Sequence, residues 1–269
     1  TPGATALGWQ AEATGAMATA VGHQTVASGA QSFAGAEDAV ASGSNAIALG
    51  NTAIASGGDA VAIGGNRDGV DGRATQATGA SSTAVGGQAL ATATAGTAFG
   101  WRAEATAERA TAVGHLAVAS GIRSFAGGEA AVASGNGAIA LGNQASASGV
   151  NSIAIGNGAT AANDGQVVIA SLDSSGQYQT GTISVVTADA NGTLGTTNNI
   201  ATTAAVGANT AAIASNTGSI VGLQSDVGSL YDITSRNTRD IRRANEGVAM
   251  ALALESPALM PGTNFALSG

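Results

Sequence analysis

Small apolar residues and glycines alternate along the first 156 residues of the chain with a period of fourteen. Each unit contains two short segments, such as NAIALG at 45–50 and TAIASG at 52–57, in which apolar or small residues alternate and Gly or Asn closes the segment. This alternation has the period of a β-strand, and the closing residues are typical of tight turns. The repeat therefore predicts a β-solenoid in which each unit forms one turn with two strands and two corners.

Three columns of equivalent positions define the repeat. The glycine column contains Gly8, Gly22, Gly50, Gly64, Gly86, Gly100, Gly114, Gly128, Gly142 and Gly156, with Ala36 in the third unit. The column three residues earlier contains Thr5, Thr19, Phe33, Ile47, Val61, Thr83, Thr97, Thr111, Phe125, Ile139 and Ile153. The column one residue before the glycine contains Leu7, Val21, Gly35, Leu49, Ile63, Val85, Phe99, Val113, Gly127, Leu141 and Ile155.

We expect the column that begins with Thr5 to lie in the interior, because bulky apolar residues recur in it. Each turn would then bury about two aliphatic side chains, which contribute roughly 1.5–3 kcal/mol each. Ordering the backbone opposes this with about 1–2 kcal/mol per residue. A single solenoid with so little bulk is expected to be weak, so the composition favours an oligomer.

The solenoid sequence is duplicated with a shift of 92 residues. ATALGWQAEAT at 4–14 aligns with GTAFGWRAEAT at 96–106, and ATAVGHQTVASGAQSFAG at 18–35 aligns with ATAVGHLAVASGIRSFAG at 110–127. The shift pairs Trp9 with Trp101, His23 with His115, Phe33 with Phe125 and Glu37 with Glu129. We expect the tryptophans to pack at a subunit seam and the histidines to be surface or structural residues, since the sequence fixes no acid–base partner relative to them.

An eight-residue slip interrupts the period at 65–73, where the sequence is GNRDGVDGR. We interpret it as a solvated loop that bulges from the solenoid. A small metal-binding or recognition loop is the alternative, although the spacing of its acids does not match a calcium loop.

A heptad pattern follows the solenoid. Residues 163–198 have no clear period and are interpreted as a connector, with short strands at 166–172 and 182–187 and a turn at 189–192. One heptad series then contains Val206, Ile213, Ile220, Val227, Thr234, Ile241 and Val248, and the other contains Asn209, Asn216, Leu223, Leu230, Asn237 and Ala244. This pattern predicts an α-helical coiled coil of about 45 residues.

Asn209, Asn216 and Asn237 occupy core positions of that coiled coil, and each is followed by Thr. Repeated buried Asn would destabilise a dimer, whereas three amides in a wider trimeric core can turn inward around water or an anion. These asparagines are therefore candidate anion ligands, and they can also fix the register and the number of strands.

Charge and composition exclude several classes of function. The chain of 269 residues carries a net charge of −8, with nine arginines, no lysine and seventeen acids, so it has no basic patch for nucleic acid. It has no cysteine, which excludes disulfides and thiolate metal sites. No run of about 18 apolar residues predicts a transmembrane helix. Its first residues, TPGATALG, lie inside a repeat and predict an internal fragment.

The fourteen-residue units resemble the YadA-like head repeats of trimeric autotransporter adhesins. The heptads at 206–210 and 213–217 look like the stalk motif of that family, and 243–269 is similar to the start of its membrane anchor. The resemblance implies a fibrous homotrimer: left-handed parallel β-roll heads at 1–162, a neck at 163–198, a trimeric coiled-coil stalk at 199–245 and a truncated outer-membrane anchor at 246–269. It also implies chloride at Asn209, Asn216 and Asn237.

This family resemblance implies a non-enzymatic adhesin passenger on the bacterial cell surface. Multivalency would convert weak contacts with host extracellular matrix, other cells or abiotic surfaces into attachment. The alternative is an ice-binding solenoid, because Thr recurs at Thr5, Thr19, Thr83, Thr97 and Thr111. A third possibility, an acyltransferase-like enzyme that uses His23 and His115, is not expected because the period is not a multiple of six.

Overall fold

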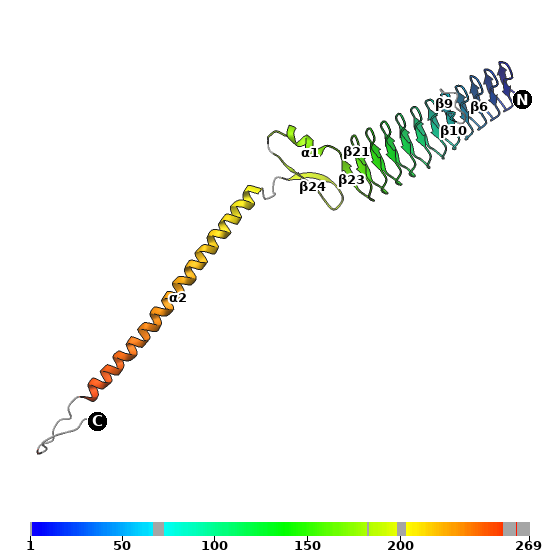
Figure 1. The fold of residues 1–269 in the computed structure, drawn as a ribbon. Coiled ribbons are helices and arrows are strands. Elements are labelled where there is room, and N and C mark those ends of the chain that lie inside the picture. Colours follow the sequence, from blue (N-terminus) through cyan, green and yellow to red (C-terminus); the bar gives the residue numbers. More distant parts are fainter. Residues whose placement is uncertain (1, 67–72, 182, 198–202, 255–261, 263–269) are drawn as a thin grey trace. The chain divides into compact units, whose positions relative to one another are not determined.

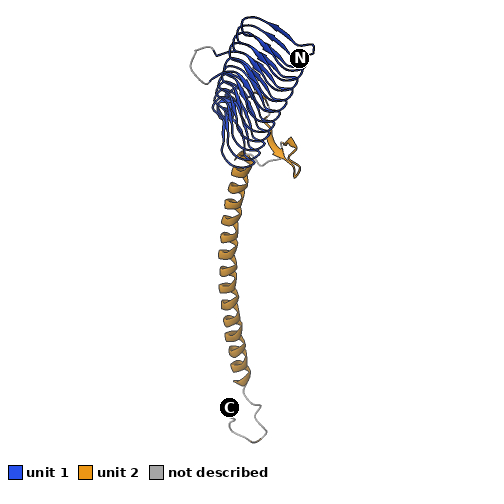
Figure 2. Cartoon of the chain, turned by 90° about the vertical axis from the view of Figure 1, so that its right-hand side faces the viewer, with its two compact units in different colours: residues 1–179 blue, residues 180–269 orange. Residues whose placement is uncertain are grey.

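The computed structural model describes residues 2–66, 73–181, 183–197, 203–254 and 262. These form two compact units, Thr1–Gln179 and Thr180–Gly269 (Figures 1 and 2). Within them, no described helix is long and apolar enough to cross a membrane. The two units are described separately below.

The first unit is a parallel β-solenoid with two sheets, as the repeat predicts (Figure 1). One sheet contains β1 (Thr5–Leu7), β3 (Thr19–Val21), β5 (Phe33–Gly35), β7 (Ile47–Leu49), β9 (Val61–Ile63), β11 (Thr83–Val85), β13 (Thr97–Phe99), β15 (Thr111–Val113), β17 (Phe125–Gly127), β19 (Ile139–Leu141), β21 (Ile153–Ile155) and β23 (Val167–Ile169). We call it the long-strand sheet, because each of its strands has three residues.

The other sheet has strands of two residues, and we call it the short-strand sheet. It contains β2 (Glu12–Ala13), β4 (Val26–Ala27), β6 (Val40–Ala41), β8 (Ile54–Ala55), β10 (Gln76–Ala77), β12 (Leu90–Ala91), β14 (Glu104–Ala105), β16 (Val118–Ala119), β18 (Val132–Ala133), β20 (Ser146–Ala147) and β22 (Thr160–Ala161). Its strands alternate along the chain with those of the long-strand sheet.

Every turn pairs in register with the next. Thr5 pairs with Thr19 in the long-strand sheet, and Glu12 pairs with Val26 in the short-strand sheet. Pairing continues across the eight-residue slip, where Ile54 lies opposite Gln76. The last strand, β23, pairs with β21 and lies inside the segment assigned above to the connector, so the solenoid extends beyond residue 162.

The glycine column exists because the turns stack so closely. Gly100 has φ +136°, and a Cβ added to it would lie 2.5 Å from the carbonyl oxygen of Gly114 in the next turn. Such a φ is strained for any residue with a side chain. The glycine recurs every fourteen residues because the backbones of successive turns are in contact at this position.

The core of the solenoid consists of alanines. The middle residue of every long strand from β3 to β21, such as Ala20, Ala48 or Ala112, is fully buried together with the alanines of the short strands from β4 to β22. Ser32, Ser82, Ser124 and Ser152 replace alanine at one interior column, and Thr25, Thr75 and Gln88 are also buried. The space between the two sheets is therefore filled almost entirely by methyl groups.

The prediction that the column beginning with Thr5 is interior is wrong, as is the expectation that each turn buries about two aliphatic side chains. Ile47 and Leu49 flank the buried Ala48 and remain 39% and 42% exposed. Neighbouring residues of a strand point to opposite faces, so an alanine directed inward sends both of its neighbours outward. An interior filled by methyl groups leaves no space for branched side chains.

Two short helices, α1 (Leu172–Ser175) and η1 (Gly176–Tyr178), end the first unit. In the second unit, β24 (Val185–Ala188) and β25 (Leu194–Thr197) form an antiparallel hairpin. The helix α2 (Thr203–Ala253) follows and covers the predicted stalk from residue 203 to 245, whereas 199–202 and most of the predicted anchor at 246–269 lie outside the described residues. Every residue of α2 is exposed in the single chain.

We predict that Gly100→Ala lowers the free energy of unfolding by about 3 kcal/mol or more, because the added methyl meets backbone at a strained φ. Gly58→Ala is the matched control, since no atom lies within 4 Å of the position that a Cβ would take there and its φ is ordinary. The control should change stability by less than about 1 kcal/mol. Urea unfolding followed by circular dichroism measures both variants, and equal stability of the two would contradict the stacking argument.

A second prediction concerns the turn between β24 and β25. The backbone N–H groups of Thr193 and, more weakly, Asn191 donate to Asp189 and hold the pKa of its carboxyl below the ordinary value. Because the pKa is lower in the folded state, the ionised carboxyl stabilises the turn at pH values above the ordinary pKa. This stabilisation is lost as the pH falls through the lowered pKa. We expect faster amide exchange in the hairpin at that acidic pH, and Asp189→Asn should remove the pH dependence.

Candidate binding surface

The outer face of the long-strand sheet is the first candidate surface. Bulky apolar side chains recur on it from turn to turn because the strands pair in register. The exposed apolar residues on this face are Leu7, Phe33, Ile47, Leu49, Ile63, Phe99, Val113, Ile139, Leu141, Ile155, Val167 and Ile169. The threonines considered for ice binding share this face with Phe33 and Ile47, so it offers no uniform threonine array.

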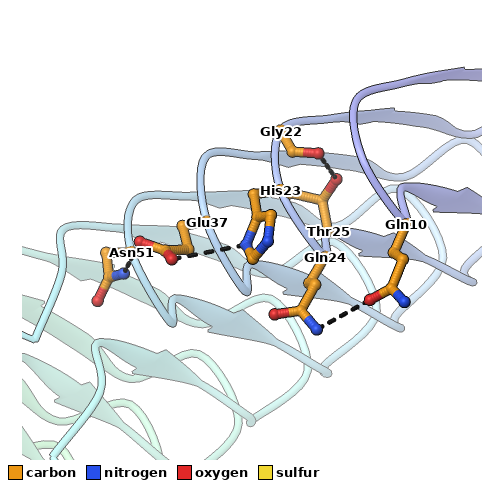
Figure 3. Close-up of polar contacts among 7 residues, drawn as sticks. All are labelled: Gln10, Gly22, His23, Gln24, Thr25, Glu37 and Asn51. Carbon is orange, nitrogen blue, oxygen red and sulfur yellow. Dashed lines mark hydrogen bonds and ion pairs between the residues drawn. The ribbon is translucent and has the colours of Figure 1, made fainter.

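A ladder of polar and aromatic side chains lies at the corner that follows the glycine column. Its first copy consists of Trp9, His23, Glu37 and Asn51, one residue from each of four successive turns. The rings of Trp9 and His23 stack with centroids 4.8 Å apart. His23 Nδ1 lies 3.5 Å from Glu37 Oε1, and Asn51 Nδ2 donates to Glu37 Oε2 at 3.1 Å (Figure 3).

The second copy of the ladder repeats this geometry. Trp101 and His115 stack with centroids 4.8 Å apart, and His115 Nδ1 lies 3.4 Å from Glu129 Oε1. Asn143 Nδ2 donates to Glu129 Oε2 at 3.2 Å. The expectation that no acid–base partner is fixed relative to the histidines is therefore wrong.

The stacking of turns explains why these side chains meet. Equivalent residues of neighbouring turns are about 4.8 Å apart, which suits stacked rings and side-chain hydrogen bonds. The residue after each ladder position has left-handed backbone, with φ +55° at both Gln10 and Gln24. These corners turn away from the sheets, and the histidine side chains remain 45% and 46% exposed.

The ladder has no catalytic arrangement. Its histidines and glutamates are open to solvent, and no nucleophilic side chain is hydrogen-bonded to either histidine among the described residues. Within the same described part of the chain, no group of three potential metal-ligating side chains occurs. The corner presents an exposed aromatic ring beside a carboxylate and an amide. This combination of side chains suits the binding of a ligand.

Asn209, Asn216 and Asn237 lie on α2, one and three heptads apart, and a single chain does not bring them together. The threonine after each of them donates to a carbonyl four residues earlier. Thr210 bonds to Val206, Thr217 to Ile213 and Thr238 to Thr234, at 2.8–2.9 Å. The segment 65–73 lies mostly outside the described residues, so its loop hypothesis stays a prediction.

The solenoid matches the model of the YadA head domain repeat in five blocks, at residues 13–35, 41–66, 77–103, 105–131 and 133–159. The chain belongs to the YadA-like trimeric autotransporter adhesins. Members of this family are non-enzymatic adhesins of the bacterial outer membrane that use type V secretion.

A solved structure is also similar to this YadA-like chain. The collagen-binding domain of the Yersinia adhesin YadA is 21% identical, and the match covers 78% of the present chain and 98% of the Yersinia chain, with a TM-score of 0.29. The family assignment rests on the repeats, since the superposition is weak. A search of curated proteins gave no significant match.

Proposed function

We propose that the chain forms a homotrimer, which is displayed on the bacterial surface and attaches the cell to extracellular matrix, other cells or abiotic surfaces. Three left-handed β-rolls would form the head, α2 would form a three-stranded stalk, and the segment from 246 would lead into the outer-membrane anchor. The observation that carries this proposal is the apolar outer face of the long-strand sheet.

This face favours burial against further copies of the chain. Twelve strands at about 4.8 Å spacing give it a length on the order of 50 Å. Soluble monomers rarely expose apolar patches larger than a few hundred Å². Because the core accepts only small side chains, the solenoid can bury its bulky residues only by association.

The helix α2 supports the same assembly. Its heptad residues Ile213, Ile220 and Leu223 are more than half exposed in one chain. Thr, Ser, Gly and Asn recur along the helix and have weak helix propensity, so an isolated helix of this composition would be marginal. Asparagines in the heptad core favour three strands over two, because a wider core can accommodate inward amides.

Adhesion by such a trimer would rely on multivalency. Each chain would contribute the same surface, and linked weak contacts can exceed the single affinity by a factor of about 10²–10⁴. The acidic net charge of −8 disfavours nucleic acid as a target. No tight ligand pocket is needed for this mode of attachment.

The proposed stalk would hold chloride or another anion at Asn209, Asn216 and Asn237. The hydroxyls of Thr210, Thr217 and Thr238 already donate to carbonyls of their own helix. The amide N–H groups of the asparagines would then be the donors directed toward the stalk axis. Three inward amides form a site for an anion, which would relieve the cost of burying polar groups.

We predict that the purified chain sediments at three times its mass of 25.4 kDa and is retained on at least one of immobilised collagen, fibronectin, laminin or bare plastic. Leu49→Glu combined with Leu141→Glu should give monomers with at least about 10²-fold weaker retention, because both charges fall on the apolar face. Sedimentation equilibrium and surface binding measure the two effects.

The matched control for this experiment is Gln76→Glu combined with Ser146→Glu. These residues lie in β10 and β20 of the short-strand sheet, and the pair adds the same charge outside the apolar face. The control should remain trimeric. A stable, folded monomer of the unmodified chain would refute the proposed function.

For the stalk, we expect bromide exchange to place anomalous scatterers on the trimer axis beside the asparagines. Asn216→Ile should remove the scatterer at its own layer and leave the others, and it should stabilise the stalk because a buried amide is lost. An axis without anomalous signal at all three layers would contradict anion binding and leave the trimer intact.

A further inference from the structure

We propose that the first ladder, together with Asp38, binds a basic, arginine-containing peptide segment of a partner protein. This inference rests on the proposed adhesin function, because it names a chemical class of target for the head. Three independent observations support it: the retention of the ladder between the two copies, an internal guanidinium in the second copy, and the charge of the first copy.

The ladder is the part of the corner tips, meaning the two central residues of each corner, that the duplication has preserved. Trp9, His23, Glu37 and Asn51 are each identical to the residue 92 positions later. All the other tip residues in these four turns differ between the copies. The differing pairs are Gln10 and Arg102, Ala16 and Glu108, Met17 and Arg109, Gln24 and Leu116, Ala30 and Ile122, Gln31 and Arg123, Asp38 and Ala130, Ser44 and Asn136, Asn45 and Gly137, Thr52 and Gln144, Gly58 and Val150, and Asp59 and Asn151.

Side chains at the corner tips are therefore free to change in this fold, and among the tip residues of these four turns only the ladder is unchanged. Core packing cannot explain its retention, because Trp9, His23 and Glu37 lie on the surface. The retention is therefore explained by a requirement for the four ladder residues to act together. Its matched geometry in the two copies supports this requirement.

The second copy carries its own guanidinium on the ladder. The Cζ atom of Arg102 lies over the Trp101 ring, 5.0 Å from the centroid, which is a cation–π contact. Arg102 Nε is buried and has no hydrogen-bond partner among the described residues, so the ring is a principal contact of this group. The protein thus contains an example of a guanidinium held by this type of site.

The first copy lacks that internal cation. Gln10 stands where the second copy has Arg102, and its Oε1 atom accepts a hydrogen bond from Gln24 Nε2 at 2.9 Å (Figure 3). The Gln10 side chain is therefore hydrogen-bonded to the next turn, and it places no charge beside the Trp9 ring. A guanidinium from another molecule can take the position that Arg102 fills in the second copy.

The charge of the first copy favours the same class of ligand. Residues 1–66 contain Glu12, Glu37, Asp38 and Asp59 and no lysine or arginine. The corresponding region of the second copy balances three glutamates with three arginines. Neutral amides hold two of the acids in the first copy, since Asn51 donates to Glu37 and Asn45 donates to Asp59. These carboxylates are oriented in advance, and this region has no lysine or arginine that could neutralise them.

The spacing of the ladder suggests how a peptide would lie. Trp9 and Glu37 are separated by two turns, or about 10 Å along the solenoid. Residues three apart in an extended peptide are also separated by about 10 Å. One arginine can thus stack on Trp9 while a second pairs with Glu37 and Asp38. A neutral glycan would gain nothing from the acidic charge of this copy.

The test uses the full chain with Trp101→Phe, so that Trp9 is the remaining tryptophan and its fluorescence reports on the site. The probe is a blocked hexapeptide, GRGGRG, and in its counterpart neutral citrulline replaces both arginines. We expect saturable quenching by the arginine peptide and at least about fivefold weaker binding of the citrulline peptide, as for loss of a contact of about 1 kcal/mol.

Variants then locate the site. Glu37→Gln should weaken binding about fivefold, whereas the matched Glu129→Gln should leave the affinity unchanged. Gln10→Arg should block the site, and it is expected to fold because Arg102 occupies the equivalent position. Arg102→Gln in the chain that keeps Trp101, measured by calorimetry, should add a second and weaker site, since Ala130 stands where the first copy has Asp38.

Several outcomes would overturn the inference. They are equal affinity for the citrulline peptide, unchanged binding in Gln10→Arg, equal effects of Glu37→Gln and Glu129→Gln, or displacement of the peptide by a neutral oligosaccharide. Absence of binding, which burial of Trp9 at a subunit seam would produce, also overturns it. Sedimentation of the same samples separates the two proposals. A trimer that does not bind the peptide would support the adhesin model and contradict the peptide site. A monomer that binds the peptide would support the site and contradict the adhesin model.

Discussion

The close, in-register stacking of successive turns is the constraint on which the head depends. Backbone groups of one turn bond directly to the next, as when the Gly22 N–H donates to the Leu7 carbonyl at 2.8 Å. At the glycine corners this spacing leaves no room for a Cβ atom, and between the sheets the core holds little more than methyl groups. The bulky side chains are displaced to the outside, where many of them remain exposed in the single chain.

The same constraint organises the exposed chemistry of the head. Because each turn stacks on the next, residues that are one unit apart in the sequence become neighbours in space at every corner. A change in one corner residue alters a column of contacts without touching the core. The two copies show this, since Arg102 and Gln10 occupy equivalent corners and make different contacts on the same backbone.

The period of fourteen was sufficient to predict the strands, their parallel pairing and the corners, because each follows from one repeated contact. It was insufficient to predict the direction of the side chains: Ile47 was interpreted as an interior residue, although the neighbouring Ala48 is the buried one. The clue was the invariant small residue between two larger ones. The contact of His23 with Glu37 was missed because residues fourteen apart become neighbours only once the turns are stacked. The proposed trimer would depend on surfaces of other copies, which no single chain contains.

The eight-residue slip shows a further property of this architecture. Ile54 pairs with Gln76 and Val61 with Thr83, so both sheets continue across the insertion with unchanged register. The turns on either side of the insertion, which the structure describes up to Asn66 and again from Arg73, therefore stack in phase. Evolution can therefore alter what a head of this type presents to antibodies or to new surfaces at its corners, while the fold that supports the presentation stays the same.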